Sequence, residues 1–90
     1  MASNRRETQM PKTIYSERYR RFQRLLVDAR RAANLTQAQL ADRLSKPQSY
    51  VAKYEGGERR LDVIEFLEVA EAIGFDPTMV IRKLIEPEES

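Results

Sequence analysis

The stretch LTQAQLADRLSKPQSYVAKYEGG, residues 35–57, constrains the fold more than any other part of the chain. It carries two helical patterns, of about nine and about eight residues, on either side of a break at Pro47. Isolated helices shorter than about 12–15 residues are marginal in water, so both must be held by packing against other segments. Because proline cannot continue an established helix, Pro47 must stand at the start of the second one. The sequence therefore predicts two short helices joined by a tight turn.

Both short helices carry start or stop signals. Thr36, followed three residues later by Gln39, matches the reciprocal capping box that opens many helices. The second helix is expected over residues 48–55, and the pair Gly56-Gly57 ends it. The apolar residues expected to face the core are Leu40, Ala41 and Leu44 in the first helix and Val51 and Tyr54 in the second.

Three further helices are indicated outside this stretch. One is expected to begin near Ser16 and to end near Asn34, and the other two start at Asp62 and Asp76. Their expected apolar faces are Phe22, Leu26, Ala29 and Ala33, then Ile64, Leu67, Ala70 and Ile73, and finally Val80, Ile81 and Leu84. No segment of any length shows the two-residue alternation of a strand. We therefore predict an all-α fold, a five-helix bundle.

Charge is unevenly distributed along the chain. The 90 residues have a net charge of +2, but residues 1–31 carry +6 and residues 62–90 carry −6. Such asymmetry suggests a basic face that meets a polyanion and an acidic face turned away from it, although charges that merely solvate helices give the same pattern. The carboxylates that step by three from residue 65 are expected on the solvent side of their helix: Glu65, Glu68 and Glu71.

Two residue types are missing altogether. The sequence has no cysteine and no histidine, which removes disulfides, thiol catalysis, the usual general base and the commonest metal ligand. No apolar run approaches the roughly 18 residues of a membrane-spanning helix. We therefore expect no enzyme activity, no catalytic residue, no metal or other cofactor, no small-molecule ligand and no membrane contact. The protein is expected in the cytoplasm, associated with the nucleoid.

The pattern TQAQLADRL…QSYVAKYEGGERRLD resembles the phage repressor and Cro-type helix-turn-helix DNA-binding domains, the xenobiotic-response-element family of bacterial and phage regulators. The resemblance extends from about residue 20 to about residue 85. It implies a lambda-repressor-like DNA-binding domain with a helix-turn-helix at residues 36–57. One departure concerns the turn, where the family usually has glycine and this chain has Ser45, which tolerates a positive φ less well.

The second helix of the motif should read DNA bases. The major groove, about 12 Å wide, admits one α-helix and displays a distinct pattern of donors and acceptors for each base pair. Polar side chains near the helix start suit that role, with glutamine able to pair with adenine and lysine able to donate to guanine or phosphate. A solvated outer face is the alternative for all four expected base-reading residues: Gln48, Ser49, Tyr50 and Lys53.

Further roles are implied for residues around this helix. In the family, the glutamine equivalent to Gln37 donates to the DNA backbone, and arginines after the helix suit phosphate geometry. The expected phosphate-binding residues are Gln37, Lys46, Arg59 and Arg60, of which Lys46 is equally well explained as a plain exposed lysine. Some family members also join the positions of Arg30 and Glu55 by a partly buried ion pair, which would be structural here.

The sequence thus predicts a sequence-specific regulator that binds double-stranded DNA, a repressor that inserts its reading helix in the major groove as a homodimer on a palindromic operator. The alternative is a protein-interaction module, or an antitoxin-type helix-turn-helix protein whose main ligand is a partner protein. Residues 1–15 are expected to form a flexible N-terminal arm, residues 16–85 the helix-turn-helix DNA-binding domain and residues 86–90 an acidic tail. The dimer surface is sought among apolar residues that could equally be core: Phe75, Met79, Val80 and Leu84.

Overall fold

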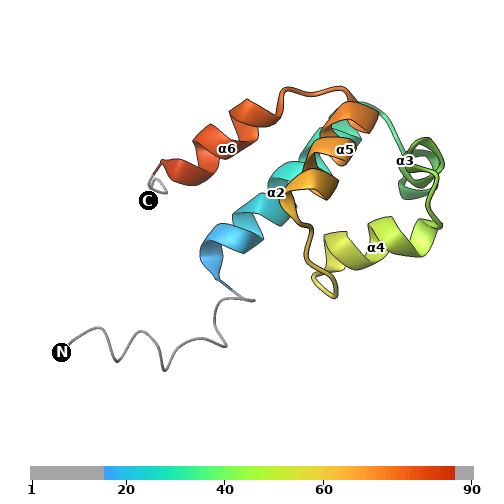
Figure 1. The fold of residues 1–90 in the computed structure, drawn as a ribbon, viewed down its shortest axis with the longest axis horizontal. Coiled ribbons are helices and arrows are strands. Elements are labelled where there is room, and N and C mark those ends of the chain that lie inside the picture. Colours follow the sequence, from blue (N-terminus) through green and yellow to red (C-terminus); the bar gives the residue numbers. More distant parts are fainter. Residues whose placement is uncertain (1–15, 87–90) are drawn as a thin grey trace.

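The computed structural model describes residues 16–86, and within them the chain forms helices and no strand. The helices are α2 (Glu17–Ala32), α3 (Gln37–Leu44), α4 (Gln48–Gly56), α5 (Val63–Ile73) and α6 (Pro77–Ile85) (Figure 1). Over this range the prediction of an all-α fold with five helices is confirmed. The arm predicted for residues 1–15 lies outside the described residues, as does the predicted acidic tail apart from Glu86. None of the helices in residues 16–86 is long and apolar enough to cross a membrane.

Local capping explains where the helices begin. The Ser16 side chain accepts a hydrogen bond from the backbone N–H of Tyr19, 3.1 Å away, at the start of α2. At the start of α3, Thr36 accepts from the N–H of Gln39 while the Gln39 side chain accepts from the N–H of Thr36. Asp62 and Glu65 form the same reciprocal arrangement at α5. Because these side chains satisfy backbone donors that a helix start leaves unpaired, each start follows from a few adjacent residues.

Left-handed backbone ends the short helices of the motif. Ser45 follows α3 with φ 58° and ψ 42°, and Gly57 follows α4 with φ 87°. The left-handed conformation costs an L-residue other than glycine roughly 1–2 kcal/mol, so the turn between α3 and α4 holds strain at Ser45. Serine at this position therefore raises the energy of the turn.

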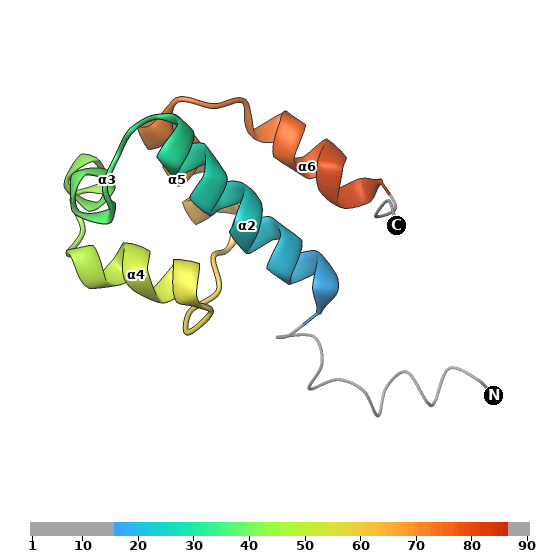
Figure 2. The same ribbon diagram turned by 180° about the vertical axis from the view of Figure 1, so that it is seen from behind.

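The helices pack around one core. α3 packs closely against α4, while α2 contacts both α4 and α6, and α5 contacts α3 and α6. Figures 1 and 2 show α3 close to end-on whereas α4 lies across the view, so the two short helices cross steeply, and α6 runs alongside α2. The buried apolar core draws on all five helices and on Leu35: Leu26, Leu35, Leu40, Ala41, Val51, Tyr54, Phe66, Val69, Ile73 and Val80.

The predicted inner face of α5 was partly wrong. Ile64 and Leu67 are 60% and 39% exposed, whereas Phe66 and Val69 are buried with Ala70 and Ile73. A spacing of three residues turns about 300° around a helix, so a series of such steps drifts off one face. The buried residues of α5 are instead separated by three, one and three positions along the sequence, which keeps them on one side of the helix.

The C-terminal apolar residues divide between core and surface. Val80 is buried, Phe75 and Leu84 pack against the core, and Met79 is exposed. Ile81, predicted to belong to the same apolar face as Val80, is also exposed. Three of the four residues considered for a dimer surface therefore serve the fold of the single chain.

Candidate nucleic-acid interface

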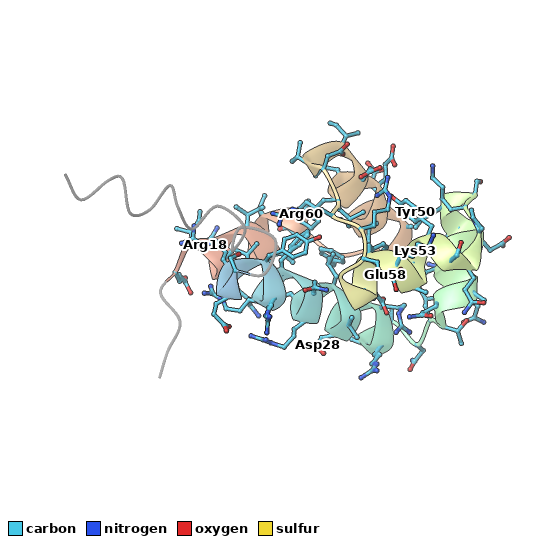
Figure 3. All side chains as sticks on the ribbon, turned by 90° about the horizontal axis from the view of Figure 1, so that it is seen from below. Arg18, Asp28, Tyr50, Lys53, Glu58 and Arg60 are labelled. Carbon is cyan, nitrogen blue, oxygen red and sulfur yellow. The ribbon has the colours of Figure 1, made fainter. Side chains whose placement is uncertain are left out.

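The two sides of α4 differ in burial. Val51 and Tyr54 lie in the core, whereas Gln48, Ser49 and Lys53 are exposed. Figure 3 views the molecule from the side of α4 and shows Lys53 on this helix, with Tyr50 beside it. The helix is therefore wedged into the fold along one side and presents polar side chains along the other.

The start of α4 faces outward without a side-chain cap. Pro47 occupies the position before the helix with φ −70° and ψ 156°, and it has no side-chain donor or acceptor to offer. The first backbone N–H groups of a helix carry a partial positive charge, which attracts anions to that end of the helix. The exposed residues Gln48 and Ser49 stand at this end of α4.

Tyr50 is half-buried, and positive side chains lie over its ring. The Nζ of Lys46 is 5.3 Å and the Cζ of Arg59 is 4.8 Å from the ring centroid. The ring also meets that of Tyr54 edge-on, with centroids 5.8 Å apart. Burial, with the negative charge of Glu65 as the next cause, raises the pKa of Tyr50, so its hydroxyl keeps its proton at neutral pH. Tyr50 thus links the outer face of α4 to the core.

Arg59 is held by Glu65 in a two-point contact. Its NH1 donates to Glu65 Oε1 at 3.1 Å and its NH2 donates to Glu65 Oε2 at 2.7 Å. The hydrogen bonds from Arg59, followed by that from the backbone of Asp62, lower the pKa of the Glu65 carboxyl to about 2. The pair remains partly open to solvent, with the side chains of Arg59 and Glu65 40% and 22% exposed.

Arg60 points to a different part of the molecule from Arg59. Its Cζ lies 4.1 Å from the centroid of the Tyr19 ring, at the beginning of α2. The hydroxyl of Tyr19 accepts a hydrogen bond from the backbone N–H of Leu61 at 3.3 Å. Tyr19 therefore anchors the loop between α4 and α5, and Figure 3 shows Arg60 on that loop.

Arg30 and Glu55 form an ion pair beneath this surface. Arg30 Nε donates to Glu55 Oε2 at 2.8 Å and Arg30 NH2 donates to Glu55 Oε1 at 3.1 Å. The two side chains are only 10% and 6% exposed. Hydrogen bonding to Glu55 raises the pKa of Arg30, and its NH1 donates to the carbonyl of Leu35 at 2.8 Å. The pair joins α2 to the end of α4.

Gln37 belongs to the same network. Its Nε2 donates to Glu55 Oε1 at 2.9 Å, so the side chain proposed to bind phosphate is fixed by the ion pair. The second amide hydrogen of Gln37 is not required by that bond. Gln37 is half-buried at the first position of α3. One carboxylate thereby ties together α2, α3 and α4.

A helix-turn-helix family model matches residues 26–80. This range contains α3, the turn, α4 and α5, together with the end of α2 and the beginning of α6. The fold is also similar to that of the XRE-family like protein from Pseudomonas syringae pv. tomato str. DC3000. That structure is 48% identical in sequence, with a TM-score of 0.79, over 88% of this chain and 99% of the other. The chain belongs to the XRE family of helix-turn-helix proteins. Among curated proteins, none matches it.

Membership of the XRE family makes this chain a DNA-binding helix-turn-helix regulator of the Cro/C1 type. In this XRE-family protein the exposed side of α4 and the polar residues around it form one region, which we call the α4 face: Gln37, Lys46, Gln48, Ser49, Tyr50, Lys53 and Arg59. Arg60, over the Tyr19 ring at the start of α2, lies apart from it. Over residues 16–86 there is no cluster of carboxylates that could hold a metal ion.

Sequence reasoning missed three residues that support the α4 face. Glu65 was expected on the solvent side of its helix, yet it holds Arg59. Tyr19 was not assigned a role, although it is buried and contacts Leu61. Gln23, one turn further along α2, donates to the carbonyl of Glu55 at 3.1 Å. Only Glu65 carried a usable signal, because its place in a capping box fixes where its carboxylate lies.

Proposed function

We propose that this XRE-family protein is a sequence-specific repressor that inserts α4 into the major groove of double-stranded DNA. The observation that supports this most is the division of α4 into a buried side and an exposed polar side. A helix whose outer side held apolar residues would suit a protein partner better, since apolar groups gain from leaving water and cannot read base edges.

Residues on the exposed side of α4 supply the base contacts in this proposal. The amide of Gln48 offers one donor and one acceptor, which match the N7 and N6 of adenine. Ser49 can serve as donor or acceptor, and Lys53 can donate to guanine or to a phosphate. Tyr50, held against Tyr54, places its ring edge toward a thymine methyl or its hydroxyl toward a phosphate.

Phosphate contacts come from residues around α4. Gln37 has an amide hydrogen to spare beyond its bond to Glu55, and Lys46 lies in the turn that precedes α4. Arg59 and Arg60 follow α4, and arginine suits phosphate because its planar fork can donate two parallel hydrogen bonds. Phosphate contacts fix the register of a protein on the duplex and carry no sequence information directly.

We further propose that the protein acts as a homodimer on a palindromic operator, with half-sites one helical turn, about 34–36 Å, apart. Apolar side chains exposed on α6 support self-association: Met79, Ile81 and Ile85. Sedimentation of the protein with and without a palindromic duplex tests this directly, and one protomer bound to each duplex would contradict it.

A mobility-shift assay tests DNA binding and separates it from the alternative. The protein is titrated onto the DNA upstream of its own gene at rising salt. Neutralising Z phosphates gives a slope of log K against log salt of about −0.9Z, whereas a module that binds only a partner protein shows almost none. Selection from random duplexes then supplies the operator, and a promoter fused to it distinguishes repression from activation.

Variants of the α4 face test the separate roles. Gln48→Ala should relax preference at one base pair, whereas Lys46→Ala should weaken binding to every sequence alike. Lys83→Ala on α6, which lies away from α4 in Figure 1, is the control for loss of one positive charge. The same change in the ratio of operator affinity to random-DNA affinity for the Gln48 and Lys46 variants would contradict these assignments.

A further inference from the structure

Arg59 is not a free cation, although it stands beside the α4 face. Both terminal nitrogens of its guanidinium donate to Glu65, at 3.1 and 2.7 Å, and NH1 also donates to the carbonyl of Arg60 at 3.2 Å. Those two nitrogens form one of the two edges through which a guanidinium can hold a phosphate in a bidentate contact. A phosphate that binds Arg59 through this edge must therefore displace the Glu65 carboxylate.

Glu65 is itself held in place by the start of α5. Its Oε1 accepts from the backbone N–H of Asp62 at 3.0 Å, while the Asp62 side chain accepts from the N–H of Glu65 at 2.7 Å. The carboxylate thus remains beside Arg59 without the loss of side-chain freedom that an unrestrained pair would incur. The position of the guanidinium over the Tyr50 ring restrains the pair from the other side.

We propose that Glu65 is a specificity-determining residue, which keeps Arg59 from the phosphates of DNA that lacks the operator sequence. This inference rests on the proposed DNA binding. On random DNA the protein moves among registers, so no phosphate stays beside Arg59 long enough to replace the carboxylate. On the operator, base contacts hold one register, and a phosphate fixed next to Arg59 competes successfully with Glu65.

Exposure of the pair makes this exchange feasible. Ion pairs that remain open to water are weak, so a phosphate can replace the carboxylate. Glu65 also places a negative charge next to Lys46 and Arg59, and this charge repels phosphates that approach without register. Because non-specific binding depends almost entirely on phosphate contacts, the loss of one contact reduces it directly.

The test compares Glu65→Gln with the wild-type protein on a short duplex of scrambled sequence. Glutamine is the other residue that completes a capping box, so this variant keeps the acceptor for the Asp62 N–H while it removes the charge that holds Arg59. Glu68→Gln is the matched control, because it removes the same charge from an exposed position one turn along α5. Circular dichroism of each variant establishes that the helices are retained.

Glu65→Gln is expected to bind the scrambled duplex more tightly, with a slope of log K against log salt steeper by about 0.9, the value of one added phosphate contact. Its advantage over wild type should therefore shrink about 3.5-fold between about 50 and 200 mM salt. On the operator the slope should change less, and Glu68→Gln should leave both slopes unchanged. In an Arg59→Ala background, Glu65→Gln should no longer steepen the slope.

Several results would overturn the inference while DNA binding itself stands. These are a wild-type slope for Glu65→Gln on scrambled DNA, weaker binding by that variant, or a steeper slope that persists without Arg59. Weaker binding would mean that Glu65 positions Arg59 for phosphate instead of withholding it. A wild-type protein that binds no duplex with any salt dependence would overturn the proposed function and this inference together.

Discussion

Removal of Glu55 is expected to destabilise this fold strongly. Its carboxylate accepts hydrogen bonds from Arg30 Nε, Arg30 NH2 and Gln37 Nε2, at 2.8, 3.1 and 2.9 Å. In Glu55→Ala all three are lost, and the guanidinium of Arg30 keeps its bond to the Leu35 carbonyl in a position that is only 10% exposed. A buried charge left without its partner costs about 3–5 kcal/mol.

That cost is large for a domain of this size. At roughly 0.05–0.15 kcal/mol per residue, a 90-residue chain has about 4.5–13.5 kcal/mol of stability in total. In a domain of 60–100 residues each kcal/mol shifts the melting temperature by about 4–8 °C, so Glu55→Ala should melt at least about 12 °C below wild type. Unfolding in urea, followed by the helical circular dichroism signal, measures the loss of unfolding free energy as a lower urea midpoint at an unchanged slope of free energy against urea concentration.

Two further variants make the test selective. Glu58→Ala removes an exposed carboxylate close to the same helix and should change stability by less than about 0.5 kcal/mol. Arg30→Met combined with Glu55→Leu removes both charges, and it should cost less than Glu55→Ala because no charge is left buried. If the free energy of unfolding of Glu55→Ala is within about 1 kcal/mol of the wild-type value, the Arg30–Glu55 pair contributes no more than an exposed ion pair does, and the reasoning is refuted.

Three other predictions follow from the backbone and from Glu65. Ser45→Gly should raise the free energy of unfolding by about 0.5–1 kcal/mol, because glycine removes the strain of φ 58°, and a loss in urea unfolding would contradict this. Gly57→Ala should destabilise by more than about 1 kcal/mol, since its φ is +87° and a Cβ would lie 3.2 Å from the Gln23 amide, whereas Gly56→Ala should be neutral or stabilising in the same thermal melts. The pKa of Glu65 falls from 4.5 to about 2 on folding, so its contribution is full above about pH 4.5 and is lost as the pH falls toward 2. Urea midpoints measured across that range should therefore decline more for wild type than for Glu65→Gln, and parallel curves would contradict the shift.

Features of the fold that depend on residues close together in the sequence could be predicted, whereas features that depend on tertiary packing could not. Capping by Thr36 and Asp62 involves residues three apart, so both helix starts were predicted and confirmed. The inner face of α5 was misassigned because Ile64 and Leu67 share a spacing with buried residues without sharing their side of the helix. Periodicity places apolar residues on faces, but only tertiary packing decides which of two neighbouring faces meets the core.

The candidate site shows the same limit more strongly. Gln48, Ser49 and Lys53 follow from the motif, because their exposure is set by the position of Val51 and Tyr54 on the opposite side of one helix. The partners of Arg59 and Arg60 could not be predicted in this way. Glu65 contacts Arg59 across the loop between α4 and α5, and Tyr19 contacts Arg60 from α2. Helical periodicity relates residues within one helix, so it predicts no contact that depends on the path of an irregular loop.

The dual use of Glu65 limits how this protein can vary. The side chain completes the start of a helix and also holds an arginine beside the α4 face. Most replacements at this position would disturb both at once, but glutamine keeps the acceptor and discards the charge, and a single base substitution in the codon converts one residue to the other. With the role proposed for Glu65, natural variation has a short path by which the affinity of this domain for non-operator DNA can be raised or lowered while its helices stay intact.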